Sequence, residues 1–208
     1  MTDTAWPLFI VTSLVIIATP GQDMLMVMSR SLSQGAAAGV ATAAGVSLGL
    51  VGHTLLATLG LGALLQASEW LFTVLKLAGA AYLLYLGIGL LRTQASEFAL
   101  PTSGHRSLPR LFVDGALSNL TNPKIAIFYF AFLPQFVRPG AAAPAASILA
   151  LGLAFAGLTF AVKGPVGWCT GLLSQWLRLR PRALTWLYRS SGAMLIGLGV
   201  KLAFERRP

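Results

Sequence analysis

Two charged residues of opposite sign stand inside apolar runs of this chain, and each run is interrupted at a proline. The first run starts at Trp6, breaks at Thr19-Pro20-Gly21-Gln22-Asp23 and resumes at Met24; the second starts at Leu111, breaks at Thr121-Asn122-Pro123-Lys124 and resumes at Ile125. Backbone that leaves a helix at membrane depth is tolerated only where protein or a wet cavity satisfies it. Paired interruptions in two halves of a membrane protein indicate a secondary-transporter site. We therefore expect a solute-binding site at these two breaks.

Asp23 is the residue of the first break that could carry a proton. A carboxylate in the middle of a membrane costs ~2.5–3.5 kcal/mol on insertion scales, and such residues usually face a cavity or a partner. Reversible protonation of Asp23 would suit a proton-coupled step. The alternative is that Asp23 only caps the second half of the span, where the helix dipole stabilises an acidic side chain. The two roles can coexist.

Pro20 and Gly21 explain the first break itself. Proline lacks a backbone N–H and clashes with the preceding turn, and glycine accepts unusual dihedrals. The amides freed at the start of the next half-helix would form a pocket for a substrate carboxylate, and Gln22 adds a side-chain amide beside them. The alternative is a kinked helix whose break is filled by its neighbours.

The second break offers a complementary set of polar groups, to which Asn119 also belongs. Lys124 could bind a carboxylate directly, or pair with Asp23 when the site is empty. Asn122 could bond the backbone groups that Pro123 frees. The alternative for Lys124 is snorkelling, in which its ammonium group reaches the lipid headgroups.

Two further residues are weaker candidates. Lys163, beside Gly164-Pro165, could supply a second cation to the site or could snorkel. His53 could titrate near neutral pH. A lone histidine on a helix of small residues is, however, more often a packing residue.

One pattern suggests an enzyme instead. Gly45-Val46-Ser47-Leu48-Gly49 matches the nucleophile elbow, which needs a strand–turn–helix context, whereas this stretch lies inside an expected spanning helix. An intramembrane serine hydrolase is the alternative that this match leaves open. The chain carries no P-loop, dinucleotide fingerprint or metal-ligand constellation, and its single Cys169 cannot form an internal disulfide. We therefore expect no enzymatic activity, no cofactor and no metal.

The composition assigns the chain to the membrane class. Hydrophobic residues make up 56% and charged residues 10% of its 208 residues, whereas a soluble domain carries about 25% charged residues. The net charge of +9 does not indicate nucleic-acid binding, because the basic residues cluster at span ends, as they do in membrane proteins. We expect the lipid bilayer as a partner and no nucleic acid. Faces rich in Gly and Ala permit a homodimer without requiring one.

The expected architecture is all-α, with six transmembrane helices in one membrane transporter domain, 1–208. A spanning helix needs about 20 apolar residues, and the expected spans are 6–29, 36–65, 70–91, 111–137, 145–173 and 184–204. A polar loop, 93–110, separates a first repeat of about 1–92 from a second of about 111–208. Because three spans are an odd number, a duplicated unit would lie inverted in the membrane, as in many carriers. Helices 1 and 4 would then be broken at Pro20 and Pro123.

These motifs resemble the lysine-exporter (LysE/RhtB-type) family of amino-acid exporters over the whole chain. The resemblance is carried by the first break, by Gly35 with Gly39, by the segment from Leu75 to Gly87, by Phe112 with Gly115, and by Asn119 to Lys124 followed by Leu133-Pro134-Gln135-Phe136. It implies six spanning helices as two inverted three-helix repeats in the bacterial inner membrane. It also implies export of amino acids or derivatives from the cytoplasm, by proton antiport. Site roles carry over to Pro20, Gly21, Asp23, Asn122, Pro123 and Lys124.

Gln22 departs from the family pattern, which usually reads Pro-Gly-Pro followed by Asn or Asp. The missing ring relaxes the break, so substrate choice could differ. A site with about as many cations as anions suits a zwitterion, and we expect a neutral substrate such as threonine, homoserine or leucine. The alternatives are a passive channel, an exporter of another small metabolite, and a scaffold or sensor subunit. One buried charge of each sign favours a carrier, because channels present rings of like groups.

Overall fold

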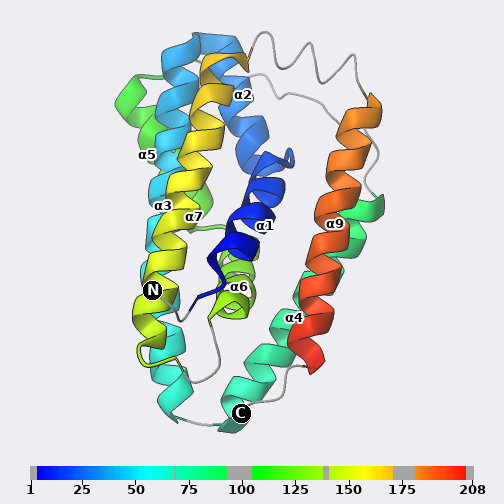
Figure 1. The fold of residues 1–208 in the computed structure, drawn as a ribbon. Helices are drawn as coiled ribbons and strands as arrows, with labels where there is room; N and C mark the ends of the chain where they lie inside the picture. The colour runs from blue at the N-terminus through cyan, green and yellow to red at the C-terminus, as the bar shows by residue number, and fades with distance from the viewer. Residues whose placement is uncertain (1–3, 68, 93–104, 138–140, 171–180, 205–208) are drawn as a thin grey trace.

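The computed structural model of the protein describes residues 4–67, 69–92, 105–137, 141–170 and 181–204 (Figure 1). Within these ranges the protein is helical, apart from one backbone bridge between Thr4 and Val137. The elements are α1 (Trp6–Ala18), α2 (Gln22–Gln34), α3 (Ala36–Ala67), α4 (Glu69–Arg92), α5 (Leu108–Leu120), α6 (Pro123–Phe132), the 3₁₀-helix η2 (Leu133–Phe136), α7 (Pro144–Trp168) and α9 (Pro181–Phe204).

The first apolar run folds as two helices, α1 and α2, whose axes are bent by 52°. Pro20 has no N–H to continue α1, and the amide of Thr19 turns to the carbonyl of Ile16 at 3.2 Å. Gln22 and Asp23, which the sequence analysis placed in the break, form the first turn of α2. α2 ends at Gln34, and the next residue, Gly35, has a φ of +91°, a backbone conformation that favours glycine.

The second apolar run folds as α5, α6 and η2. α6 starts at Pro123, a position where the missing N–H of proline costs nothing. Asn122 caps α6, because its Oδ1 accepts a hydrogen bond from the amide of Lys124 at 3.0 Å. α5 begins at Leu108 rather than at the expected 111, since a proline in its first turn favours an earlier start. Residues 93–104 of the expected loop lie outside the described residues.

The long helices α3, α4, α7 and α9 cover the expected second, third, fifth and sixth spans. α7 does not stop at Lys163-Gly164-Pro165, where the sequence suggested an interruption, and Pro165 lies inside the helix. Membrane helices tolerate such a proline where neighbouring groups satisfy the freed backbone. α7 ends at Trp168, before the expected end at 173, and the last three residues of that expected span lie outside the described part.

α3 packs along both α5 and α7, and glycines permit the close approach. A Cβ atom at Gly39 would lie 2.8 Å from the Cα of Gly167, and one at Gly115 would lie 2.6 Å from the carbonyl oxygen of Thr42. Small residues at such contacts let membrane helices come together. The enzyme-like pattern 45–49 lies wholly inside α3, without the strand and turn that a nucleophile elbow needs.

α4 and α9 form a second group, which stands apart from α3 and α7 in Figure 1. Here Gly87 and Gly192 meet: a Cβ on either would lie 2.7 Å from the carbonyl oxygen of the other. α1 contacts both α7 and α9, and α6 contacts both α3 and α4. One helix of each broken run, α1 and α6, therefore lies between the two helix groups, whereas α2 and α5 pack on α3.

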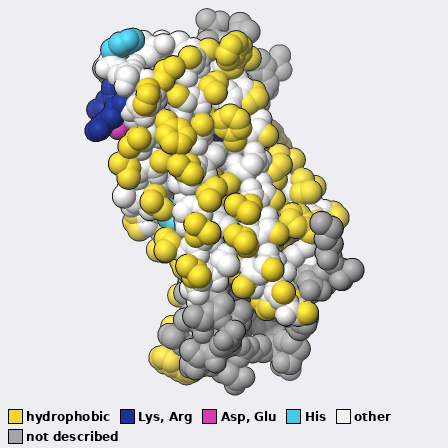
Figure 2. Space-filling view, turned by 90° about the vertical axis from the view of Figure 1, so that its left-hand side faces the viewer, with side chains coloured by type: hydrophobic (Ala, Val, Ile, Leu, Met, Phe, Trp, Pro, Cys, Tyr) yellow, Lys and Arg dark blue, Asp and Glu magenta, His cyan; other side chains and the backbone are white. Residues whose placement is uncertain are grey.

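Apolar side chains are spread over much of the face that Figure 2 shows, while the basic residues visible there gather near its upper end. Several of the largest apolar side chains are 71–81% exposed, which suits lipid rather than water: Leu59, Trp70, Trp186 and Phe204. By length and composition, α3 (over Ala36–Gly60) and α7 can each cross a membrane, and the bent α1–α2 pair adds a third crossing if it is one span. The described residues thus form an all-α polytopic membrane protein, while the count of six spans stays a prediction.

Candidate functional site

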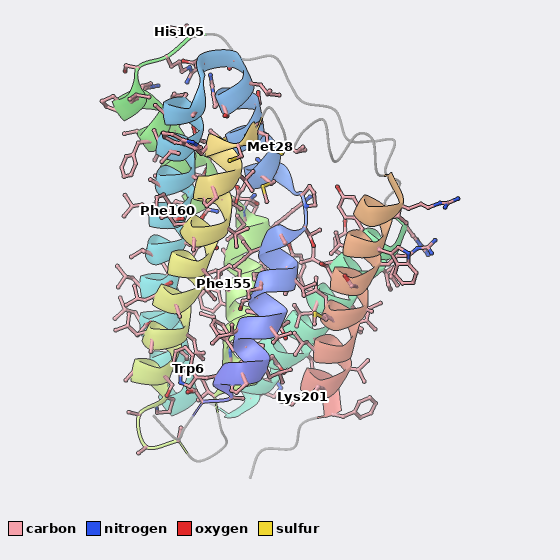
Figure 3. The ribbon with its side chains drawn as sticks, turned by 45° about the horizontal axis from the view of Figure 1, so that its top comes forward. Trp6, Met28, His105, Phe155, Phe160 and Lys201 are labelled. Atoms are coloured by element: carbon pink, nitrogen blue, oxygen red, sulfur yellow. The ribbon has the colours of Figure 1, made fainter. Side chains whose placement is uncertain are left out.

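A cavity of about 820 Å³ lies at the two breaks, between the α3–α7 group and the α4–α9 pair. Such a volume falls within the range of small-molecule sites. Its polar wall comes from Thr19 to Asp23, Asn122, Lys124, Thr159, Lys163 and Arg92. Its apolar wall includes Ile16, Ile17, Leu50, Phe128, Phe155 and Leu195. Phe155 of α7 is buried, packing edge-on against Tyr129 of α6, whereas Phe160 on another side of α7 is exposed (Figure 3).

Asp23 and Lys163 form an ion pair in this wall. Lys163 Nζ lies 3.3 Å from Asp23 Oδ2, and the two side chains are only 10% and 13% exposed. The amide Nδ2 of Asn119 donates to the same oxygen at 2.9 Å. A buried carboxylate needs such partners, because charge removed from water is costly unless it is paired and hydrogen-bonded. Asp23 is thus held by α5 and α7 together.

The other oxygen of Asp23 is left without a partner. Oδ1 is buried and makes no hydrogen bond within the described residues. Buried polar atoms are almost always bonded, so an exception asks for an explanation such as a bound ligand or a functional role. Since Asp23 lines the cavity, this oxygen is a candidate ligand-binding atom.

Asn119 connects Asp23 to α3. Its backbone carbonyl lies 3.0 Å from Nε2 of His53, and because a carbonyl only accepts, Nε2 carries the hydrogen. Its side chain rests on Gly49, where a Cβ would lie 2.8 Å from Asn119 Oδ1. His53 is 2% exposed and is not among the residues that line the cavity. His53 and Gly49 therefore support Asn119 from behind the site.

The two breaks are joined by a hydrogen bond between side chains. Asn122 Nδ2 donates to Gln22 Oε1 at 3.3 Å, so the residue that departs from the family pattern bridges the halves. Pro20, Gly21, Gln22, Asn122 and Lys124 line the cavity, whereas Pro123 and Asn119 stand outside the lining set.

Lys124 is not the partner of Asp23 in the described part of the chain. It is exposed and lines the cavity, while Lys163 occupies the place that the sequence analysis considered for Lys124. Lys124 stays a prediction as a substrate-binding residue.

Sequence reasoning missed the residues of α9 that bond the first break. Tyr188 donates to the carbonyl of Pro20 at 3.0 Å, and Ser191 Oγ lies 3.2 Å from the carbonyl oxygen of Val15. Ser191 also pairs with the hydroxyl of Thr19, which itself donates to the carbonyl of Val15 at 2.9 Å. The broken helix leaves these carbonyls without their usual backbone partners, so α9 satisfies them. The sequence gives no signal that would predict which helix the side chains of Tyr188 and Ser191 contact.

A similar contact ties α4 to the second break. The hydroxyl of Tyr82 donates to the carbonyl of Lys124 at 3.1 Å. The α4–α9 pair therefore supplies one tyrosine hydroxyl to each break: Tyr188 to the first and Tyr82 to the second.

Comparison with known proteins gives a consistent set of relatives. A family model described as LysE type translocator matches residues 14–206. A membrane protein of Pseudomonas aeruginosa, itself uncharacterized, is 37% identical over 194 residues, which cover 90% of this chain and 89% of the relative. A homoserine/homoserine lactone efflux protein of Salmonella typhimurium is 32% identical over 206 residues, covering 99% of both chains. An uncharacterized membrane protein of Vibrio cholerae is 32% identical over 198 residues, 95% of this chain and 96% of its own. No solved structure matches the chain.

Proposed function

The chain belongs to the LysE type translocator family, and from that premise we propose that it exports neutral amino acids or their derivatives in exchange for protons. The family and its efflux relatives are transporters rather than enzymes. Two of the relatives are homoserine/homoserine lactone efflux proteins, matched over 99% of their length. The observation that carries the proposal is the ion pair of Asp23 with Lys163 in the wall of the cavity.

The substrate carboxylate binds at the start of α2. The first amides of a helix have no partner inside the helix and attract anions. Gly21 precedes this turn, and a Cβ there would meet nothing within 4 Å, so the approach is open. Lys124 and Arg92 add positive charge to the cavity wall, beyond the paired Asp23 and Lys163. Among the described residues the wall thus carries three cations and one anion, which is more positive charge than the sequence analysis expected, and the excess suits a substrate whose carboxylate faces the basic groups.

Asp23 couples the proton to transport. When Asp23 is ionised it holds Lys163 and joins α2 to α7. A proton on Asp23 removes that ion pair and loosens the two helices from each other. A proton and a substrate then favour different arrangements of the same site, which is the condition for shifting between two states. An inward proton gradient would drive the return step.

The two halves are inverted repeats in the bacterial inner membrane. What supports this is the pairing of corresponding helices: α3 packs on α7, and α4 packs on α9. The helices of the first pair run in opposite directions, since Gly39 approaches Gly167 while Thr54 approaches Gly152. A pseudo-two-fold axis in the membrane plane produces antiparallel pairs of this kind. The two breaks, with Pro20 and Pro123, would then be equivalent.

The test is flux of a panel of labelled amino acids from preloaded proteoliposomes, with and without an imposed pH gradient. We expect gradient-dependent efflux of a few neutral amino acids, homoserine and threonine among them. Movement that ignores the gradient would instead indicate a passive channel. No movement of any amino acid by folded, inserted protein would contradict the proposed function and point to another small metabolite.

A further inference from the structure

The hydroxyl of Thr159 on α7 lacks the backbone hydrogen bond that threonines usually make in helices. A helical threonine commonly donates its hydroxyl to the carbonyl four residues earlier, which is one of its two favoured side-chain orientations. Among the described residues, seven threonines that lie in helices or directly follow one do so: Thr12, Thr19, Thr42, Thr54, Thr58, Thr121 and Thr170. Thr159 is 1% exposed, and its hydroxyl has no partner in the described residues, although the carbonyl of Phe155 stands four residues before it.

Thr159, which carries this unpartnered hydroxyl, is one of the residues that line the cavity. Phe155, Thr159 and Lys163 recur at intervals of four residues on α7, and all three line the cavity. The spacing puts them on one face of the helix. Thr159 therefore lies one turn from the lysine that pairs with Asp23.

A second unpartnered oxygen lies in the same wall. Asp23 Oδ2 accepts hydrogen bonds from Lys163 and Asn119, whereas Asp23 Oδ1 is buried and has no partner in the part of the chain that the structure describes. Both residues line the cavity, and each holds a buried oxygen without a partner in the described residues: a carboxylate oxygen, which only accepts hydrogen bonds, and a hydroxyl, which accepts and donates. A carboxylate of the substrate would be repelled at Asp23, so the group that fits both atoms is a positively charged donor.

We propose that Asp23 Oδ1 and Thr159 Oγ1 form the subsite for the ammonium group of the substrate, which makes Thr159 a specificity-determining residue. This assignment rests on the proposed function and adds to it the orientation of the substrate. The ammonium group lies against α7, and the carboxylate lies at the start of α2. Proton and ammonium group then compete for one carboxylate, which couples their movements.

The buried hydroxyl of Thr159 should lower the free energy of unfolding of the protein when no substrate is bound. A buried polar group without a partner destabilises the protein, and replacing it with an apolar group of the same shape is neutral or stabilising. Thr159→Val should therefore leave the empty protein at least as stable as the parent while weakening substrate binding. A purely structural threonine would lower stability when replaced. Residues kept for a ligand at the expense of stability are typical of functional sites.

The experiment compares three variants in proteoliposomes, with thermal unfolding of the purified protein measured in parallel. Thr159→Val should raise the KM for the transported amino acid roughly tenfold or more, as expected for a lost hydrogen bond to a charged group. Thr159→Ser keeps the hydroxyl and should restore the KM. Thr42→Val is the matched control, because the hydroxyl of Thr42 is buried on α3 and already bonded to Ala38. It should leave the KM unchanged.

Two competitors identify the group that Thr159 binds. The methyl ester of the transported amino acid keeps the ammonium group, whereas the N-acetyl derivative keeps only the carboxylate. The ester should inhibit uptake by the parent protein and inhibit Thr159→Val much less. A parent KM for Thr159→Val, a lower stability of that variant, or stronger inhibition by the N-acetyl derivative would each overturn the assignment. If instead the proposed function is wrong, the parent protein itself will transport no amino acid, and this result distinguishes the two failures.

Discussion

Lys163 Nζ lies 3.3 Å from Asp23 Oδ2, although 140 positions separate the two residues in the chain. The contact joins the first turn of α2 to the last third of α7, so each half of the chain supplies one charge. Both side chains line the same cavity and are nearly buried. The proposed function gives this pair a role in transport in addition to its contribution to stability, and mutation can separate the two.

Removing only one member of the pair should destabilise the protein. Lys163→Met leaves Asp23 buried without its cation, and breaking a buried ion pair typically costs about 3–5 kcal/mol. Because both groups border a cavity that water can enter, we expect about 1–3 kcal/mol, with a clear fall in Tm in detergent. The double variant Asp23→Asn with Lys163→Met should recover most of the Tm but not the transport.

Lys124→Met is the matched control for that experiment, since Lys124 lines the cavity without contacting Asp23. Its Tm should stay close to that of the parent protein. A fall in Tm as large as that of Lys163→Met would mean that Lys124 is the main partner of Asp23.

Gly49→Ala should disturb the site from behind. The added methyl group would lie 2.8 Å from both Cβ and Oδ1 of Asn119, and overpacking of this kind typically costs about 1–3 kcal/mol. Displaced Asn119 no longer orients Asp23, so we expect transport to fall at least several-fold. Gly157→Ala is the control, because a Cβ there meets nothing within 4 Å. Initial rates of amino-acid efflux measure both, and equal rates for the two variants would contradict the role given to Gly49.

His53 should act through its position rather than through a proton. Its Nε2 bonds the carbonyl of Asn119, and its ring stays outside the lining of the cavity. His53→Gln should lower the transport rate several-fold and leave the shape of its pH dependence unchanged. The measurement is the initial rate between pH 5.5 and 8.5. A pH dependence that flattens in this variant would make His53 a coupling group, as one interpretation of the sequence allowed.

Tyr188→Phe should weaken the link between α9 and the first break. The change removes only the hydroxyl that bonds Pro20, and leaving a buried carbonyl without its partner costs about 1–3 kcal/mol. We expect a lower Tm and a lower transport rate. Tyr85→Phe is the control, because Tyr85 also lines the cavity but is 66% exposed. Matching losses in both variants would show that tyrosine hydroxyls in general, and not this contact, matter.

Local features of the sequence were enough to locate most helix ends. The missing N–H of Pro20 and the capping side chain of Asn122 act on their immediate neighbours, so their effects can be predicted without tertiary structure. The choice between Lys124 and Lys163 could not be made in this way. Both stand beside a proline in an apolar run, and which one reaches Asp23 depends on how α6 and α7 are rotated against α2.

Contacts between helices that are distant in the sequence could not be predicted either. Tyr188 and Ser191 bond backbone carbonyls of Pro20 and Val15, which carry no side-chain signal in the sequence. The hydroxyl of Thr159, which has no partner in the described residues, could not be predicted either, since a threonine in an apolar helix normally bonds its own backbone. The missing hydrogen bond of Thr159 can be recognised only from the three-dimensional structure.

The central claim is that Asp23 is the carboxylate shared by proton and substrate. The most direct measurement is the release of protons when the transported amino acid binds to purified protein in weakly buffered detergent, followed with a pH indicator. At pH values low enough to protonate Asp23 in the empty protein and so break its ion pair with Lys163, the parent protein should release protons when substrate binds. Asp23→Asn, at substrate concentrations that still raise its Tm, should release none. Proton release that is unchanged in Asp23→Asn would contradict the account.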